Sequence, residues 1–350
     1  MTLKKPKITY FIGAGASYSS CPIWTEQGNK MIEVACKYFK KNTGFFITKP
    51  TDLVEHAEEI IWDIGYFGLK ANKFGTIDTY AKKLHLNASF KELSRLKLSV
   101  SVFFTIWQLT NDRNLKSRKI QDKEYVFEEI DKRYISLFAS ILESKSSVEI
   151  KIKENIRFVS WNYDLQLEYA FKSFNQDNLS WEFICNNLNF RAGISDNKEL
   201  DICHLNGYHG FYNVKEREEH FLDLTESKGI NEIVDSLSFL YNSHRNNGFS
   251  LSNHINYAWE KNPIAQKTRD EALRIFSETD ILIIIGYSFP NFNKEIDKEL
   301  FKRLQGRKTR IYYQDPNASL NFIKQLVDIN ECEVIIEKEK LDNFILPYDF

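Results

Sequence analysis

The sequence has few cysteines, and they are not arranged as metal ligands. There are five in 350 residues, and none forms a C-x-x-C pair (Cys21, Cys36, Cys185, Cys203, Cys332). Zinc modules with four cysteine ligands are normally built from such pairs, so we expect no metal site. Scattered cysteines in odd number are typical of reduced, mostly buried thiols.

An excess of charge of one sign and a long apolar run are also missing. The 47 basic residues are balanced by 48 acidic ones, which predicts no general attraction to nucleic acid or to acidic membranes. The longest apolar stretches, such as 281–285, are far too short to cross a bilayer. The first 15 residues show no pattern of a signal peptide, so we expect a cytoplasmic protein.

What the sequence does contain is an alternation of strand and helix patterns. Residues 8–12 are β-branched or aromatic and predict a buried strand, whereas residues 26–145 are mainly helical in pattern. The charged stretch 112–124 lacks apolar periodicity and predicts an exposed loop that could contact a partner. From about residue 155 onward, further strands are predicted at 156–161, 181–186, 200–207, 280–288, 310–316 and 332–338.

Helices between these strands predict the fold class. Strands joined by helical crossovers indicate α/β architecture, a Rossmann-like parallel sheet with helices on both faces. We therefore predict one domain from 1–25 and 150–350, with an inserted helical module at 26–149 and no zinc module.

Polar and glycine-rich sequence collects where the predicted strands end. In an open parallel sheet, ligands bind outside the carboxyl ends of the strands. Five segments are expected at that edge: Gly13-Ala14-Gly15-Ala16-Ser17, Asn162-Tyr163-Asp164, His204-Leu205-Asn206-Gly207, Gly286-Tyr287-Ser288, and Gln314-Asp315-Pro316. Each could serve a turn or a helix cap, but together they predict one site with two glycine turns suited to phosphate.

The order of these motifs resembles the sirtuin-like NAD-consuming family. G-A-G-A-S, W-N-Y-D, H-L-N-G, I-G-Y-S-F and Y-Q-D-P follow one another as in that family, and most closely as in the bacterial effectors of anti-phage defence. Residues 74–84 and 131–142 resemble segments of that branch's helical module. The resemblance implies an NAD⁺ hydrolase that releases nicotinamide and ADP-ribose and depletes NAD during infection.

The resemblance also implies roles for individual residues. The pyrophosphate would lie against Gly13, Ala14, Gly15 and Ser17, and the other NAD-binding positions would be Asn206, Gly207, Gly286, Ser288 and Asp315. Asp315 would accept from the adenosine ribose. Asn162 would hold the nicotinamide ribose and the attacking water, and Asp164 would take the nicotinamide amide, although a helix cap explains Asp164 equally well.

One departure concerns the catalytic base. The family usually has L-H-G where this chain has Leu205-Asn206-Gly207. His204 shares a strand face with Asn206 because residues i and i+2 point the same way, so we predict His204 as the base, with His209 as the second candidate. A structural histidine is the alternative.

Three functional hypotheses follow. The first is the NADase, the second is a sensor or scaffold subunit that binds NAD or a nucleotide with weak turnover, and the third is a deacylase. The missing cysteine pairs count against the third. The resemblance implies restraint by homo-oligomerisation or by a separately encoded sensor or ATPase partner. Linear and cyclic ADP-ribose both remain open as products.

Overall fold

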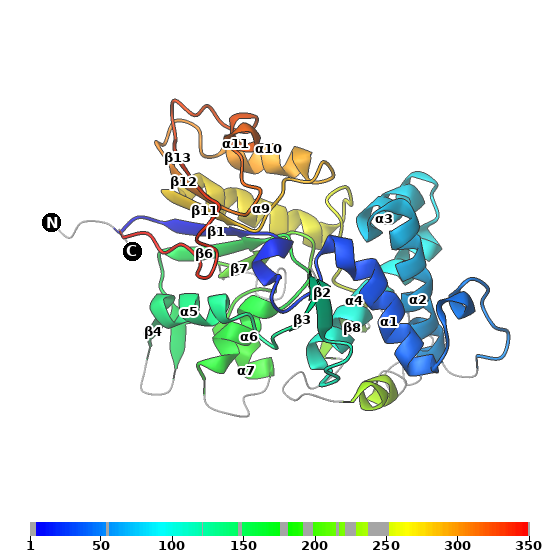
Figure 1. Ribbon diagram of the computed structural model, residues 1–350. Helices are drawn as coiled ribbons and strands as arrows, with labels where there is room; N and C mark the ends of the chain where they lie inside the picture. Colours follow the sequence, from blue (N-terminus) through cyan, green and yellow to red (C-terminus); the bar gives the residue numbers. More distant parts are fainter. Residues whose placement is uncertain are drawn as a thin grey trace. The chain divides into compact units, whose positions relative to one another are not determined.

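The computed structural model describes residues 5–53, 56–120, 122–145, 149–175, 181–191, 199–214, 217–220, 229–236 and 252–348. The chain divides into two units (Figure 1). Unit 1 comprises Met1–Tyr18, Ile130–Gly207 and Asn256–Phe350. Unit 2 comprises Ser19–Glu129 and Tyr208–Ile255. The sequence predicted domain boundaries at 25 and 150, whereas the corresponding limits of these units lie at 18 and 130. Unit 2 also includes 208–255, which the sequence had assigned to the sheet domain.

Unit 1 is built on a six-stranded parallel sheet, as the sequence predicted. Its strands are β1 (Ile8–Ile12), β6 (Ile156–Ser160), β7 (Ile202–His204), β11 (Ile281–Ile285), β12 (Arg310–Gln314) and β13 (Glu333–Glu337). Their spatial order is β13-β12-β11-β1-β6-β7, and all five pairings are parallel. Counted along the chain, this is the order 3-2-1-4-5-6 of dinucleotide-binding Rossmann sheets. The predicted fold class is thereby confirmed.

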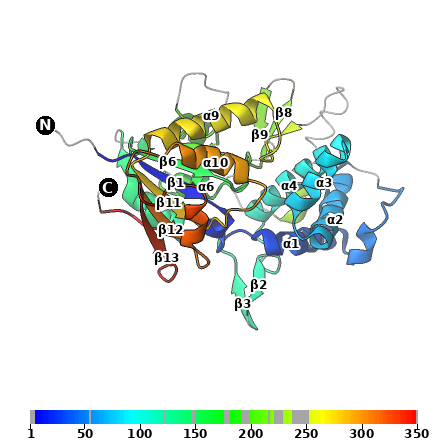
Figure 2. The same cartoon turned by 90° about the horizontal axis from the view of Figure 1, so that it is seen from above.

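Helices cover both faces of this sheet (Figures 1 and 2). On one face lie α9 (Pro263–Glu278), α10 (Lys294–Lys302) and α11 (Leu320–Lys324); on the other lie α5 (Lys132–Ile141), α6 (Gln166–Ser173) and α7 (Trp181–Asn187). Successive side chains of β1 point to opposite faces of the sheet, so neighbouring residues pack against different groups of helices. Phe11 packs edge-on against Phe276 and Phe301, whereas Tyr10 stacks on Phe158 toward α5. Unit 1 also contains a short antiparallel hairpin of β4 (Leu142–Ser144) and β5 (Ile150–Ile152).

Unit 2 is mainly helical. Its helices include α1 (Trp24–Phe39), η2 (Thr43–Phe46), α2 (His56–Phe74), α3 (Ile77–Leu86) and α4 (Phe90–Leu109). It also contains the hairpin of β2 (Ser117–Ile120) and β3 (Lys123–Val126), and a small antiparallel sheet of β8 (Phe211–Val214), β9 (Arg217–His220) and β10 (Ser252–Asn253). The side chains in the second half of α4 are buried, as its apolar sequence predicts.

Two local predictions were wrong. Residues 181–186 form helix α7 rather than a strand, because a six-residue apolar run carries no period that separates the two, and Trp181 packs edge-on against Tyr169 of α6. Much of 112–124 forms the β2–β3 hairpin rather than a loop. Arg118 anchors it by lying 3.8 Å from the centroid of Phe127, whose ring packs on Trp107.

No helix among the described residues is both long and apolar enough to cross a membrane. Nor do three or more His, Cys, Asp or Glu side chains gather there in a way that could hold a metal ion.

Candidate functional site

The strand order locates the candidate site. β1 lies between β11 and β6: the chain runs outward from β1 through β6 to β7, then returns to β11 on the other side of β1 and runs outward through β12 to β13. Dinucleotides bind at such a switch point, outside the carboxyl ends of the strands. Three of the five segments that the sequence predicted, 13–17, 162–164 and 286–288, follow β1, β6 and β11 at this edge.

The loops after β1 and β11 pack directly on each other. A Cβ on Gly13 would lie 2.5 Å from the carbonyl oxygen of Gly286, and a Cβ on Gly15 would lie 2.9 Å from the Cα of Gly286. Gly286 has a φ of +60°, and a Cβ there would overlap the backbone nitrogen of Ala16. All three glycines are therefore needed to bring the two loops together, before any ligand is considered.

Backbone hydrogen bonds fix the same two loops. The Gly13 N–H donates to the Ile285 carbonyl and the Gly15 N–H to the Gly286 carbonyl, both at 2.9 Å. Ala16 donates to the carbonyl of Gly13, also at 2.9 Å, within the 3₁₀ turn η1 (Ala14–Ser17). The exposed Ala14 donates its N–H to no acceptor in the described part of the chain. Of the predicted phosphate-binding residues, Ala14 is therefore the one whose amide is available to an anion.

Ser17 joins the first loop to the segment after β6. The Asn162 Nδ2 donates to Ser17 Oγ at 3.2 Å, and Ser17 Oγ donates to Asp164 Oδ1 at 3.1 Å. The Tyr134 hydroxyl lies 3.2 Å from the same oxygen. Because the single Ser17 proton goes to Asp164, Tyr134 is left as a donor, which gives a chain of bonds from Tyr134 through Ser17 to Asp164.

Asn162 and Asp164 each keep an oxygen that no described residue uses. Asp164 Oδ1 accepts from Ser17 and from the N–H of Gln166 at 3.2 Å, whereas Oδ2 accepts no bond from the described residues. The same holds for Asn162 Oδ1. Burial raises the pKa of Asp164 to about 6, although the bonds from Gln166 and Ser17 and the nearby His204 oppose the shift. The site thus offers two acceptor oxygens, on two residues that both bond Ser17 Oγ, and the carboxyl among them has a pKa of about 6.

His204 is engaged at both ring nitrogens. Nε2 lies 2.7 Å from Glu168 Oε1, and Nδ1 lies 3.3 Å from the carbonyl oxygen of Asn162. Both partners are acceptors, so the geometry suits a doubly protonated imidazolium. Burial alone would lower the pKa of His204, but Glu168, the Asn162 carbonyl and Asp164 together raise it. To act as a base, His204 would first have to release one of these partners.

Two more of the predicted residues after β7, Asn206 and Gly207, donate hydrogen bonds to backbone carbonyls close to Asn162 and His204. Asn206 Nδ2 donates to the Trp161 carbonyl at 3.1 Å, while its buried Oδ1 has no partner among the described residues. Gly207 turns the chain with a φ of +71°, and its N–H donates to the His204 carbonyl. His209 belongs to unit 2, where its ring is buried 3.0 Å from the Thr105 hydroxyl and bonds to Gln108.

The predicted residues near β11 and β12 differ in exposure, and Asp315 is buried to about the same degree as Asp164. Ser288 is exposed and Gly286 is half-exposed. Asp315 follows β12, and its Oδ1 accepts from the N–H of Asn317 at 2.7 Å, which closes a turn. Its second oxygen accepts no bond from the described residues, and burial raises its pKa.

Sequence reasoning missed four side chains that support the site. Tyr134 and Glu168 contact predicted residues directly, and Arg133 donates to carbonyls of the first loop. Asp297 of α10 accepts from Trp161 Nε1 at 3.2 Å and from the Tyr287 hydroxyl at 2.8 Å, so it ties the residue before Asn162 to the residue after Gly286. Burial raises the pKa of Asp297 to about 8. Arg133 and Tyr134 lie in the 131–142 segment on which part of the sequence resemblance rests, but nothing in that segment assigned them to the site, and Glu168 and Asp297 lie outside every motif, so the fold identifies all four.

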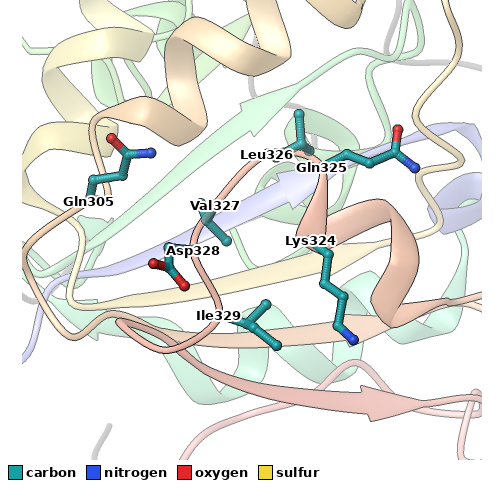
Figure 3. Close-up of a pocket in the computed structure, with 7 residues that line it drawn as sticks. All are labelled: Gln305, Lys324, Gln325, Leu326, Val327, Asp328 and Ile329. Carbon is teal, nitrogen blue, oxygen red and sulfur yellow. The ribbon is translucent and has the colours of Figure 1, made fainter.

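A recess elsewhere on unit 1 can be separated from this site. It is lined by Gln305 and by residues 324–329 (Figure 3). These residues connect α10 to β12 and α11 to β13, so they lie at the amino ends of those strands. Ligands of open parallel sheets bind at the carboxyl ends. The recess therefore does not belong to the candidate site.

Comparison with known proteins gives weak similarity to solved structures. No family model and no curated protein matches the chain. A Sir2 homologue mutant in complex with ADP-ribose is 11% identical, with 96% of this chain and 88% of that chain covered and a TM-score of 0.44. A structure described as the basis of sirtuin substrate affinity is 9% identical, with coverages of 97% and 91% and a TM-score of 0.38. These values are too low to assign a family, and the strand order alone carries the fold.

Proposed function

We propose that the protein is an NAD⁺ glycohydrolase. The observation that carries the proposal is the cluster of Ser17, Asn162 and Asp164 beside the Rossmann switch point, with two unused acceptor oxygens. The motif order supports NAD rather than another dinucleotide. Water would displace nicotinamide from C1′ of the ribose, with the electron pair of the glycosidic bond leaving on the pyridine nitrogen and one proton lost from water.

Asn162 orients the sugar and the water in this proposal. Its Nδ2 is held by Ser17, so Oδ1 has a fixed position from which it accepts from a ribose hydroxyl or from the attacking water. The bond from His204 Nδ1 to the Asn162 carbonyl fixes the backbone of the same residue.

Asp164 holds the leaving group and opposes developing charge. Its Oδ2 accepts from the nicotinamide carboxamide, and its negative charge stabilises a ribose that becomes cationic as the bond to nitrogen lengthens. Both effects require the ionised form. His204 stays our candidate for the base, on the condition that a bound ligand displaces the Asn162 carbonyl from Nδ1 and that Nδ1 has released its proton before it accepts one from water.

The direct test is release of nicotinamide from NAD by the purified chain, measured by chromatography. We expect turnover that falls at least about a hundredfold in Asn162→Ala, as for the loss of an orienting group. The matched control is Asn175→Ala, because the Asn175 side chain bonds only the Phe171 carbonyl at the end of α6. Equal rates in both variants would reject the assignment.

A second candidate is a sensor or scaffold subunit that binds NAD without efficient cleavage. The engaged nitrogens of His204 favour it, because each ring nitrogen of this histidine faces an acceptor and neither is available to take a proton from water. Tight NAD binding with no nicotinamide release, in the presence or absence of a partner, would select this function over the first.

The biological setting is proposed from the resemblance alone. An NADase of this type would deplete NAD in infected cells as an effector of anti-phage defence. Its restraint would come from a homo-oligomer or from a separately encoded sensor or ATPase. Low turnover by the isolated monomer and higher turnover in a complex is the expected pattern, and full constitutive activity of the monomer would contradict it.

A further inference from the structure

Arg133 is the point where three distant segments of unit 1 meet. The guanidinium donates to both oxygens of Asp131, at 3.0 and 2.7 Å, which fixes its orientation at the start of α5. Nη2 also donates to the Ala16 carbonyl at 3.0 Å and reaches the Gly15 carbonyl at 3.5 Å. Asp131 is itself buried, and its backbone N–H donates to Gln166 Oε1 at 2.9 Å.

The third segment is formed by residues 340–345. Arg133 Nη1 donates to the Leu341 carbonyl at 3.4 Å, and the guanidinium carbon lies 4.9 Å from the centroid of the Phe344 ring. Phe344 is buried and packs edge-on against Tyr134, whose hydroxyl contacts Ser17. The 340–345 segment therefore reaches the first loop by two routes, through Arg133 and through Tyr134.

The same segment is held firmly against the sheet. Gln314 Nε2 donates to the carbonyls of Lys340 and Asn343, both at 2.7 Å, and Gln314 Oε1 accepts from the Ile345 N–H at 3.1 Å. The Tyr10 hydroxyl donates to the Ile345 carbonyl at 3.1 Å. Every polar atom of the Gln314 side chain is thus committed to this segment, and Gln314 directly precedes Asp315.

We propose that Arg133 is a positioning residue for the nucleotide site, and that residues 340–345 act on the first glycine loop through it. The carbonyls of Gly15 and Ala16 point to a fixed cation, so the N–H of Ala14 and the hydroxyl of Ser17 keep their direction toward a ligand phosphate and toward Asp164. The ligand's identity rests on the proposed function, whereas the coupling between the segments does not.

Arg157 provides a matched control. It also donates to two backbone carbonyls, of Glu154 at 3.1 Å and Ile156 at 2.7 Å, and to a carboxylate, Glu199, at 3.2 Å. Arg157 lies near the amino end of β6, whereas the loops of the candidate site follow the carboxyl ends of the strands. Arg157→Ala therefore removes a comparable set of bonds without touching the first loop.

The experiment measures amide hydrogen exchange of peptides covering residues 13–18 in the ligand-free protein, together with the Kd for NAD. Loss of a charge-assisted bond predicts that Arg133→Ala speeds exchange in this loop about tenfold and raises the Kd by about tenfold, with Arg133→Lys intermediate. Phe344→Ala should speed exchange in the same loop, and Arg157→Ala should change neither quantity.

The proposal would be overturned if residues 13–18 exchanged their amide hydrogens at equal rates in Arg133→Ala and Arg157→Ala. It would also be overturned if these residues exchanged at the wild-type rate in Phe344→Ala. If Arg133→Ala does not fold, Arg133→Lys and Phe344→Ala carry the test. A wild-type chain that binds no NAD would refute the proposed function, while the exchange comparison would still decide the coupling.

Discussion

His204 Nε2 and Glu168 Oε1 lie 2.7 Å apart in the interior of unit 1, and both side chains are almost fully buried. A buried ion pair is not by itself a source of stability, but removing one partner leaves an uncompensated charge. Because His204 also supports the Asn162 carbonyl, this pair connects the stability of the fold to the geometry of the site.

Replacing Glu168 should therefore be costly. We expect Glu168→Ala to lower the free energy of unfolding at pH 6 by about 3 kcal/mol, measured by urea denaturation. Arg274→Ala, which breaks partly exposed ion pairs on α9, should cost about 1 kcal/mol or less.

The pH dependence of this pair has a definite sign. The folded-state pKa of His204 is raised, so its contribution is complete below its unfolded pKa of about 6.5 and is lost as pH rises through the folded pKa. The stability difference between the wild type and Glu168→Gln should shrink as pH increases above neutrality. A difference that grows with pH would contradict the ion pair.

Asp164 should control the pH dependence of NAD cleavage. Its pKa is raised to about 6, and the proposed chemistry needs the carboxylate, so kcat should rise as pH increases through about 6. Asp164→Asn should lower kcat and remove this rise. A wild-type profile that is flat between pH 5 and 7 would argue against the assigned role.

Gly286→Ala should disrupt the contact between the two loops. The new methyl group would overlap the backbone at Ala16, and the residue would keep a left-handed φ, so we expect a loss of at least about 3 kcal/mol in unfolding free energy. Gly306 is the matched control, because it also has a positive φ but has open space around it. Gly306→Ala should cost only about 1–2 kcal/mol.

Asp297 should make the fold less stable at alkaline pH. Burial raises its pKa to about 8, so the folded state holds a proton that the unfolded state releases near pH 4. The unfolding free energy should therefore fall as pH rises from about 4 to about 8, and Asp297→Asn should reduce this slope. An unchanged slope in the variant would show that other groups cause it.

The sequence predicted the parallel sheet well because its signals are local. The run Ile281–Ile285 is apolar throughout, as a strand covered on both faces must be, and β1 was predicted with its observed bounds. Segments 13–17, 162–164 and 286–288 were predicted at one edge because parallel strands end together. These inferences need only strand position and direction.

What the sequence could not provide depends on contacts between distant residues. Nothing in the sequence near His204 indicates that Glu168, 36 positions earlier, meets its Nε2. The glycines at 13, 15 and 286 suggested phosphate binding, whereas the structure gives them a first role in packing one loop against the other. The roles assigned to Asn162, His204, Asp164 and the NAD-binding residues stay predictions.

The most direct measurement of the central claim is a crystal structure of the protein soaked with NAD. The account predicts the pyrophosphate against the Ala14 amide and Ser288, with the nicotinamide ribose beside Asn162 and the carboxamide at Asp164. Density for NAD at any other position, or none at millimolar concentration in a crystal where the first loop is accessible, would contradict the assignment of this edge of the sheet.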